Sequence, residues 1–299
     1  MIDLSILTTE ARNPDTLNLD EMTPLEIASI MNQEDENAVK AVKEVLPQVG
    51  TAIEWATESL REGGRIIYIG AGTSGRLGVL DAVECPPTFG VPREMVVGLI
   101  AGGEKAFVEA VEGAEDSETL CEEELRAINL TSKDIVIGLA ASGRTPYVIY
   151  GLDYANQTGC HTVAIACNKG SDIGKTAKLA IEPVTGPEVL TGSTRLKAGT
   201  AQKMILNMIS TGSMVGIGKA YENLMVDVKQ SNEKLVVRSQ NILMTATGCS
   251  REEAKEALNQ AEGHVKTAVI MVLSGCGPDE ARQKLSQAGG KIREALKFF

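Results

Sequence analysis

Three short segments combine glycine with serine, threonine and arginine, a composition that suits the binding of phosphate. They are residues 72–76 (GTSGR), 142–145 (SGRT) and 192–195 (GSTR). Glycine lets a ligand approach the main chain closely, hydroxyl groups donate hydrogen bonds, and free amides at the start of a helix point toward an anion. Because one chain carries three such segments, the sequence predicts a pocket for a phosphorylated small molecule.

The first of these segments does not fit the common nucleotide-binding motifs. GTSGR lacks the Gly-Lys-Ser/Thr ending of a P-loop, and Gly70, Gly72 and Gly75 satisfy the dinucleotide pattern only nominally. The next apolar run, MVVGLIAG, ends without the acidic residue that would bind a ribose. We therefore expect no nicotinamide cofactor.

A parallel sheet is predicted to position the first two segments. Five apolar runs of strand length alternate with helical stretches: RIIYIG, MVVGLIAG, DIVIGLAAS, HTVAIAC and KLAIEPV. Continuously apolar strands indicate a sheet that is covered on both faces, hence a mostly parallel, doubly wound arrangement. GTSGR and SGRT each follow a strand directly, at the edge where open α/β sheets bind ligands.

Helices are predicted before and after the strand-forming part of the sequence. Thr23-Pro24 is typical of a helix start, a second helix follows over about 47–61, and residues 197–220 read as one long buried helix. Residues 247–270 and 274–297 repeat each other at an offset of 27, so each copy is expected to form a helix, a glycine turn and a second helix.

The fold class expected is therefore α/β, with a doubly wound sheet, N-terminal helices and a small C-terminal all-helical domain. We place a helical segment at 1–62, a domain with the three phosphate-binding segments at 63–222 and the helical domain, with its two related hairpins, at 232–299.

Composition excludes several classes of function. A formal charge of -11 and an aromatic content of 3% oppose binding to nucleic acid. No apolar run approaches the roughly 20 residues that span a bilayer, and the first residues do not resemble a signal peptide, so a cytoplasmic protein is expected. The six cysteines lack C-x-x-C spacing and there are two histidines, so we expect reduced thiols, no metal and no cofactor.

Longer sequence strings resemble those of known protein families. The strand-GTSGR-helix and strand-SGRTP-helix pair resembles the SIS family of sugar isomerase domains. The chain is further similar to the N-acetylmuramic acid 6-phosphate etherases, and this resemblance extends over nearly its whole length. The strings that carry it are LTTEARNP, RLGVLDAVECPPTFG, AFVEAVEGAEDS and GPEVLTGSTRLKAGTAQKMILNMIS.

This resemblance implies a homodimeric carbon-oxygen lyase of peptidoglycan recycling. Such an enzyme cleaves the D-lactyl ether of N-acetylmuramic acid 6-phosphate without a metal and gives N-acetylglucosamine 6-phosphate and D-lactate. The two catalytic glutamates of the family match Glu84 in DAVECPP and Glu115 in EGAEDS.

Elimination followed by hydration suits an ether at C3 of a sugar, because the C2 proton is acidified by the C1 aldehyde of the open chain. One carboxylate removes that proton while a neutral carboxyl protonates the departing lactate. The apolar neighbours of Glu84 favour its neutral form if the side chain is buried, so our hypothesis makes Glu84 the acid and Glu115 the base.

The remaining candidates are binding residues. Arg144 is expected to contact phosphate or the lactate carboxylate, or else to form a structural salt bridge, and Glu188 and Lys197 are expected to line the sugar pocket. The residues expected to contact phosphate and hydroxyl groups are Thr73, Ser74, Gly75, Ser142, Gly143, Thr145, Ser193 and Thr194.

Two other functions remain open at this point. An aldose-ketose phosphosugar isomerase would use the same fold and a similar base. A non-catalytic sugar-phosphate sensor, similar to glucokinase regulatory proteins, would bind the ligand without turnover.

Overall fold

The computed structural model describes residues 7–109, 111–228 and 233–299 and contains a five-stranded parallel sheet. The strands are β1 (Ile66–Gly70), β2 (Val96–Ile100), β3 (Ile135–Leu139), β4 (His161–Ile165) and β5 (Leu179–Ile181). Their order across the sheet is β2-β1-β3-β4-β5, and all neighbours are parallel. Every strand falls within one of the predicted apolar runs.

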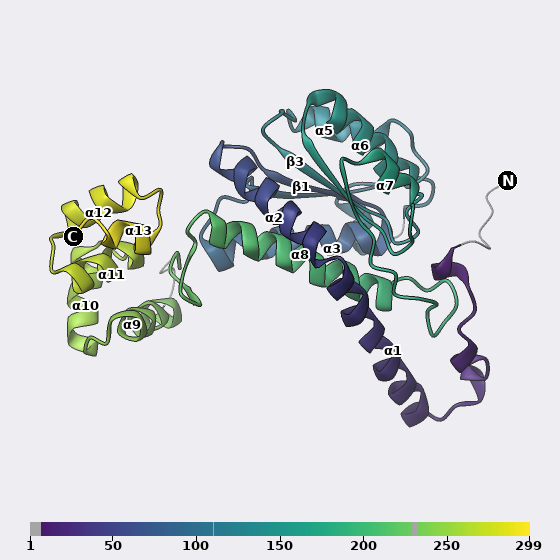
Figure 1. The fold of residues 1–299 in the computed structure, drawn as a ribbon, viewed down its shortest axis with the longest axis horizontal. Helices are drawn as coiled ribbons and strands as arrows, with labels where there is room; N and C mark the ends of the chain where they lie inside the picture. The colour runs from purple at the N-terminus through teal and green to yellow at the C-terminus, as the bar shows by residue number, and fades with distance from the viewer. Residues whose placement is uncertain (1–6, 110, 229–232) are drawn as a thin grey trace. The chain divides into compact units, whose positions relative to one another are not determined.

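Helices cover both faces of the sheet (Figure 1). One face is covered by α5 (Leu120–Ala127), α6 (Pro146–Thr158) and α7 (Asp172–Thr176), and the other by α2 (Leu46–Arg61), α3 (Gly72–Phe89) and α8 (Lys197–Gly216). All residues of β1 and β3 are buried, as a central strand between two helical layers requires. The predicted doubly wound α/β fold is confirmed.

The N-terminal segment precedes the sheet as three 3-10 turns and a long helix. The turns are Thr8–Glu10, Pro14–Thr16 and Leu19–Glu21, and α1 spans Pro24–Glu44. α1 begins with a capping box, in which Thr23 and Glu26 each accept a hydrogen bond from the other's main-chain amide. The predicted start of this helix is confirmed.

The predicted end of the long buried helix is wrong. α8 stops at Gly216, and Ala220, which we expected to be helical, belongs to a two-stranded ribbon of β6 (Ala220–Tyr221) and β7 (Leu224–Met225). Gly218 takes a left-handed conformation at φ 84°, which ends the helix and which other residues rarely adopt. A short helix, α4 (Lys105–Val108), follows β2.

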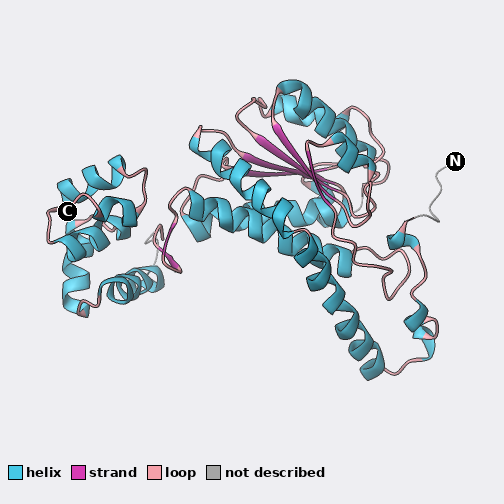
Figure 2. Cartoon of the chain, viewed as in Figure 1, coloured by secondary structure: helices cyan, strands magenta, loops and turns pink. Residues whose placement is uncertain are grey.

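Five helices make up the C-terminal part of the chain (Figure 2): α9 (Glu233–Thr247), α10 (Arg251–Gln260), α11 (Val265–Ser274), α12 (Pro278–Gln287) and α13 (Ile292–Leu296). α10–α11 and α12–α13 are the two predicted hairpins. Matching glycines, Gly263 and Gly290, adopt left-handed conformations at the turns, with φ of 80° and 79°. The repeat in sequence is therefore a repeat in structure.

The chain divides into two compact units, residues 1–83 with 94–210 and residues 84–93 with 211–299. The predicted boundaries after residues 62 and 222 stay predictions, and residue 232 lies outside the described residues. All six cysteines are free, and four of them are buried. Among the described helices, none is both long and apolar enough to cross a membrane.

Candidate active site

The strand order creates a ligand-binding position at the carboxyl ends of β1 and β3. The chain leaves β1 toward β2 on one side of the sheet, whereas β3 leads to β4 and β5 on the other side. Ligands of open α/β sheets bind where the winding changes direction in this way. GTSGR follows β1 and SGRT follows β3, so the fold brings the first two predicted segments to this position.

The first segment forms the opening turn of α3 and packs tightly against the end of β1. A Cβ on Gly75 would lie 2.6 Å from the Gly70 carbonyl oxygen, so only glycine fits. Ser74 is buried, and its hydroxyl donates to Gln202 Oε1 at 2.9 Å on α8. Ser74 thus has an internal partner, while Gly72 and Thr73 at the helix start are more accessible.

The second segment leads into α6, a helix of 13 residues that begins with Pro146. Gly143 has φ 79°, and a Cβ there would lie 2.3 Å from Ser171 Cβ, so conformation and space both require glycine. Ser142, Arg144 and Thr145 are half-buried around it. Arg144 lies within 4.0 Å of Asp172, which agrees with the salt bridge that we considered for it.

Glu115 lies beside this helix start. The Tyr147 amide in the first turn of α6 donates to the Glu115 carbonyl oxygen at 3.0 Å. Residues from the first segment and from the Glu115 loop together line a pocket of about 220 Å³, among them Gly72, Arg76 and Glu115. The Arg76 guanidinium is held by the Phe107 carbonyl oxygen at 2.9 Å. An exposed carboxylate therefore lines the same pocket as the start of a glycine-rich helix.

Glu84 lies three turns along α3, and its side chain is exposed. The condition on which its neutral form depended, burial among apolar neighbours, is therefore not met in the single chain. Glu84 is not among the residues that line the Glu115 pocket. Exposed Leu80 lies four positions before Glu84, on the same side of the helix, and exposed Val83 is adjacent to Glu84 in sequence, so apolar surface near Glu84 is uncovered.

The third predicted segment lies at the start of α8. Ser193 and Thr194 are half-buried in the turn that precedes the helix. The would-be Cβ of Gly199 on α8 lies 3.7 Å from the Thr73 side chain, so the start of α8 packs close to the first turn of α3. The third segment is thereby brought near the first.

Glu188 and Lys197 have internal partners rather than open surroundings. The Glu188 carboxylate accepts hydrogen bonds from the Lys197 and Ala198 amides at 3.0 and 2.9 Å, and burial raises its pKa despite these bonds. The Lys197 ammonium forms a buried ion pair with Glu34 on α1. Both residues hold the start of α8 in place, and the expectation that they line the sugar pocket stays untested.

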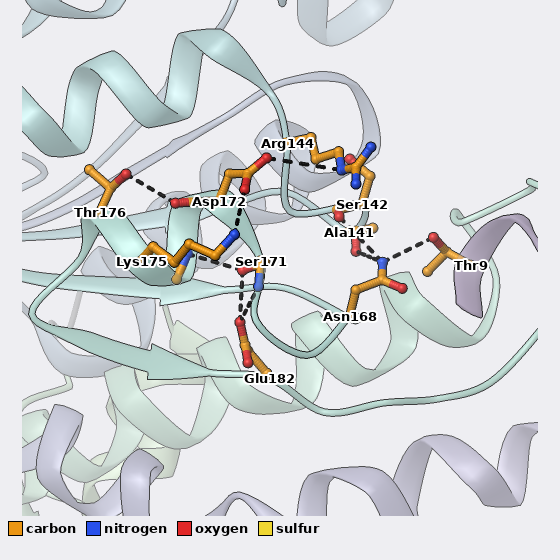
Figure 3. A network of polar contacts seen from close by, with 11 residues as sticks. Thr9, Ala141, Ser142, Arg144, Asn168, Ser171, Asp172, Lys175, Thr176 and Glu182 are labelled. Atoms are coloured by element: carbon orange, nitrogen blue, oxygen red, sulfur yellow. Dashed lines mark hydrogen bonds and ion pairs between the residues drawn. The ribbon is translucent and has the colours of Figure 1, made fainter. Parts of the chain in front are cut away.

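Sequence reasoning missed a set of residues that support the second segment. Asn168, which is 3% exposed at the end of β4, donates to Thr9 Oγ1 at 3.0 Å and to the carbonyl oxygens of Ala141 and Ser142 at 3.3 Å (Figure 3). Its side-chain oxygen accepts from the amide and hydroxyl of Thr8, both at 2.9 Å. A polar residue directly after the apolar run HTVAIAC was the available signal.

No group of three or more histidine, cysteine, aspartate or glutamate side chains that could hold a metal ion occurs within the described ranges.

Comparison with known proteins identifies the family. Residues 48–156 match the glucokinase regulatory protein N-terminal SIS domain, residues 121–211 match the SIS domain, and residues 222–264 match the C-terminal lid domain of glucokinase regulatory protein. The N-acetylmuramic acid 6-phosphate etherase of Enterobacter sp. (strain 638) is 59% identical over 269 residues, covering 90% of this chain and 91% of that protein. The etherase of Cronobacter sakazakii (strain ATCC BAA-894) is 60% identical with the same coverage. The chain belongs to the N-acetylmuramic acid 6-phosphate etherase family.

Membership of the etherase family confirms the predicted enzyme class, carbon-oxygen lyase. A phosphoheptose isomerase from Francisella tularensis has the same fold, with a TM-score of 0.50 and 14% identity. The match covers 65% of this chain and all of that chain. At this identity the likeness shows the fold alone, so the chemistry must be argued from the site.

Proposed function

We propose that this enzyme cleaves the D-lactyl ether of N-acetylmuramic acid 6-phosphate and releases N-acetylglucosamine 6-phosphate and D-lactate. The observation that carries the proposal is the pocket in which Glu115 and the glycine-rich start of α3 lie together. The first amides of a helix have no partner within it, so the start of α3 suits a phosphoryl group while a carboxylate faces the sugar.

The reaction proceeds in two stages on the open-chain sugar. Glu115 takes the C2 proton and leaves an enolate that the C1 aldehyde stabilises. The enolate electrons then form the C2=C3 double bond, and the C3–O bond breaks as Glu84 protonates the lactate oxygen. Water then adds at C3 of the unsaturated aldehyde, and a proton returns to C2. The hydrogen bond from the Tyr147 amide fixes the main chain at Glu115 and so limits the positions of its carboxylate.

Glu84 requires a less polar environment than the single chain provides if it is to be the acid. We infer that the enzyme works as a homodimer in which a second copy covers the α3 surface around Glu84. Leu80 and Val83, which are 44% and 58% exposed, support this, because apolar side chains on a helix surface gain stability when a partner covers them. Such cover would also desolvate Glu84 and favour its neutral form.

The binding roles follow from accessibility. We assign phosphate and hydroxyl contacts to the half-buried Thr73, Ser142, Thr145, Ser193 and Thr194, with Arg144 as an anion contact. Gly75 and Gly143 are buried and their amides donate to carbonyl oxygens, so these two glycines shape the turns instead. Three other residues support the site without contacting the ligand. Ser74 is bonded to Gln202, Glu188 to the amides at the start of α8, and Lys197 to Glu34. The same proposal places the enzyme in the cytoplasm, where its free thiols stay reduced, without nucleic acid as a partner.

The test is D-lactate release from N-acetylmuramic acid 6-phosphate in the presence of a chelator. Glu115→Gln is expected to lower the rate about 10²- to 10⁴-fold, the usual contribution of a general base. The matched control is Glu118→Gln, which removes a neighbouring exposed carboxylate of the same loop. In deuterium oxide, Glu84→Gln should still exchange the C2 proton, whereas exchange that persists in Glu115→Gln would refute its role as the base.

The same assay separates the competing functions. A phosphosugar isomerase would release no lactate from this substrate. The matches to the glucokinase regulatory protein families favour a sugar-phosphate sensor as the second candidate. Stoichiometric binding of the sugar phosphate without any turnover would support the sensor and exclude the etherase.

A further inference from the structure

A second pocket of about 220 Å³ lies at the carboxyl edge of the sheet, between the loops that follow β3 and β4. Ser142 and Arg144 contribute from the first loop, Lys169, Asp172 and Lys175 come from the second, and Thr8 closes it from the N-terminal segment. Figure 3 shows Asp172 between Arg144 and Lys175. We call this the cationic pocket.

Positive charge exceeds negative charge among the described residues that line this pocket. Asp172 interacts with Lys175 at 2.9 Å and lies 4.0 Å from Arg144. The exposed ammonium of Lys169 has no ion pair with a described residue. Among the described residues of the lining, three cations and one anion give a formal charge of about +2, in a chain whose net charge is -11. Such a local excess attracts an anion.

Several main-chain amides of the loop that follows β4 already have acceptors. The Gly170 and Ser171 amides both donate to the Glu182 carboxylate at 2.9 Å, and the Gly174 amide donates to Ser171 Oγ at 3.0 Å. Phosphate sites in α/β folds depend mainly on free amides at a turn or a helix start. The cationic pocket instead presents a guanidinium and two ammonium groups, with the Ser142 hydroxyl beside them.

The walls of the pocket are fixed before any ligand binds. Asn168 uses its amide nitrogen and oxygen to join Thr8 and Thr9 to the main chain at Ala141 and Ser142. Glu182 holds the turn that carries Lys169. Because these contacts are internal, an arriving anion would not have to order the loops that carry the cations.

We propose that the cationic pocket binds the carboxylate of the lactyl group, an inference that rests on the proposed function. The substrate carries two anionic groups, and the phosphoryl group is assigned to the glycine and hydroxyl segments with their helix amides. Ser142 and Arg144 belong both to such a segment and to the cationic pocket, so a ligand held at this loop can reach both. A guanidinium matches the planar shape of a carboxylate.

The test compares two ethers of N-acetylglucosamine 6-phosphate, the natural 3-O-lactyl compound and a 3-O-ethyl analogue that lacks the carboxylate. Lys169→Gln is expected to lower kcat/KM for the lactyl ether about tenfold, as removal of a charge-assisted contact does. It should leave the rate for the ethyl ether unchanged. Lys203→Gln, an exposed lysine on α8 outside the pocket, is the control that should alter neither rate.

Two results would overturn the proposal. An equal fall for both ethers would mean that Lys169 contacts the phosphoryl group, and no change for either would mean that the pocket holds no part of the substrate. Thermal unfolding of Lys169→Gln shows whether the variant is folded. The proposed function is judged separately, because it fails only if the unaltered enzyme releases no lactate from the lactyl ether.

Discussion

The two edges of the same sheet use charge in opposite ways. At the amino edge, Arg65 precedes β1 and Asp134 precedes β3, and these two side chains bond to each other at 2.8 Å. At the carboxyl edge, Glu115 and Lys169 each line a pocket. Charges that are satisfied internally stabilise the fold, whereas charges that face a pocket are available for binding and catalysis.

The amino edge shows how completely such a pair can be satisfied. Asp134 is 1% exposed and accepts hydrogen bonds from the Arg65 amide and guanidinium and from the Thr131 amide. The guanidinium also donates to the carbonyl oxygens of Ile128 and Asn129. Both carboxylate oxygens and all three guanidinium nitrogens have partners, so the pair closes this end of the sheet.

The largest expected effect on stability comes from breaking the ion pair at the amino edge. Asp134→Ala leaves the Arg65 charge without its partner and should lower the free energy of unfolding by about 3 kcal/mol. Because the amino edge is not part of the site, kcat/KM of the folded variant should stay unchanged. Chemical denaturation and lactate release measure the two quantities. Asp153→Ala, at an exposed position on α6, is the control, and a proportional loss of activity would contradict the division between the edges.

The same pair makes stability depend on pH. Burial by itself would raise the pKa of Asp134, but the hydrogen bonds from Arg65 and Thr131 outweigh it and hold this pKa below its ordinary value. A carboxyl whose pKa is lowered by folding stabilises the protein above its unfolded pKa and loses that contribution as the pH falls through the folded value. Below about pH 4, the free energy of unfolding should therefore fall less steeply with decreasing pH in Asp134→Asn than in the unaltered enzyme.

A matched pair of glycines provides the next test. Gly143 at the carboxyl edge and Gly159 just before β4 at the amino edge have φ of 79° and 92°. An alanine at either position is strained by about 1–2 kcal/mol. At Gly143 the new methyl group would also meet Ser171 Cβ at 2.3 Å, whereas at Gly159 its nearest neighbour is at 3.4 Å.

We therefore expect Gly159→Ala to cost stability alone and Gly143→Ala to cost stability and activity together. Thermal unfolding and kcat/KM for lactate release give both values. Equal activity in the two variants would mean that the SGRT turn does not need its observed conformation for catalysis.

The strands and helix starts were predictable from sequence because local composition determines them. Five apolar runs gave five strands, and Thr23-Pro24 began a capped helix. The support for the site was not predictable, since Asn168 bonds to Thr8 from 160 residues away and no local pattern records that contact. The exposure of Glu84 could not be read from its apolar neighbours, because Val83 and Pro87 are exposed on the helix with it.

The smallest expected effect uses the single tryptophan as a reporter of the amino edge. Trp55 on α2 stacks on His161 at the start of β4, with ring centroids 4.5 Å apart and planes inclined by 22°. His161→Ala removes this contact and should lower stability by about 1 kcal/mol while shifting the tryptophan emission. Substrate or product binding at the opposite edge should leave that emission unchanged in the unaltered enzyme. A fluorescence change that saturates with sugar phosphate would instead show that the two edges are coupled through the sheet. The division between an amino edge for stability and a carboxyl edge for binding and catalysis would then be wrong.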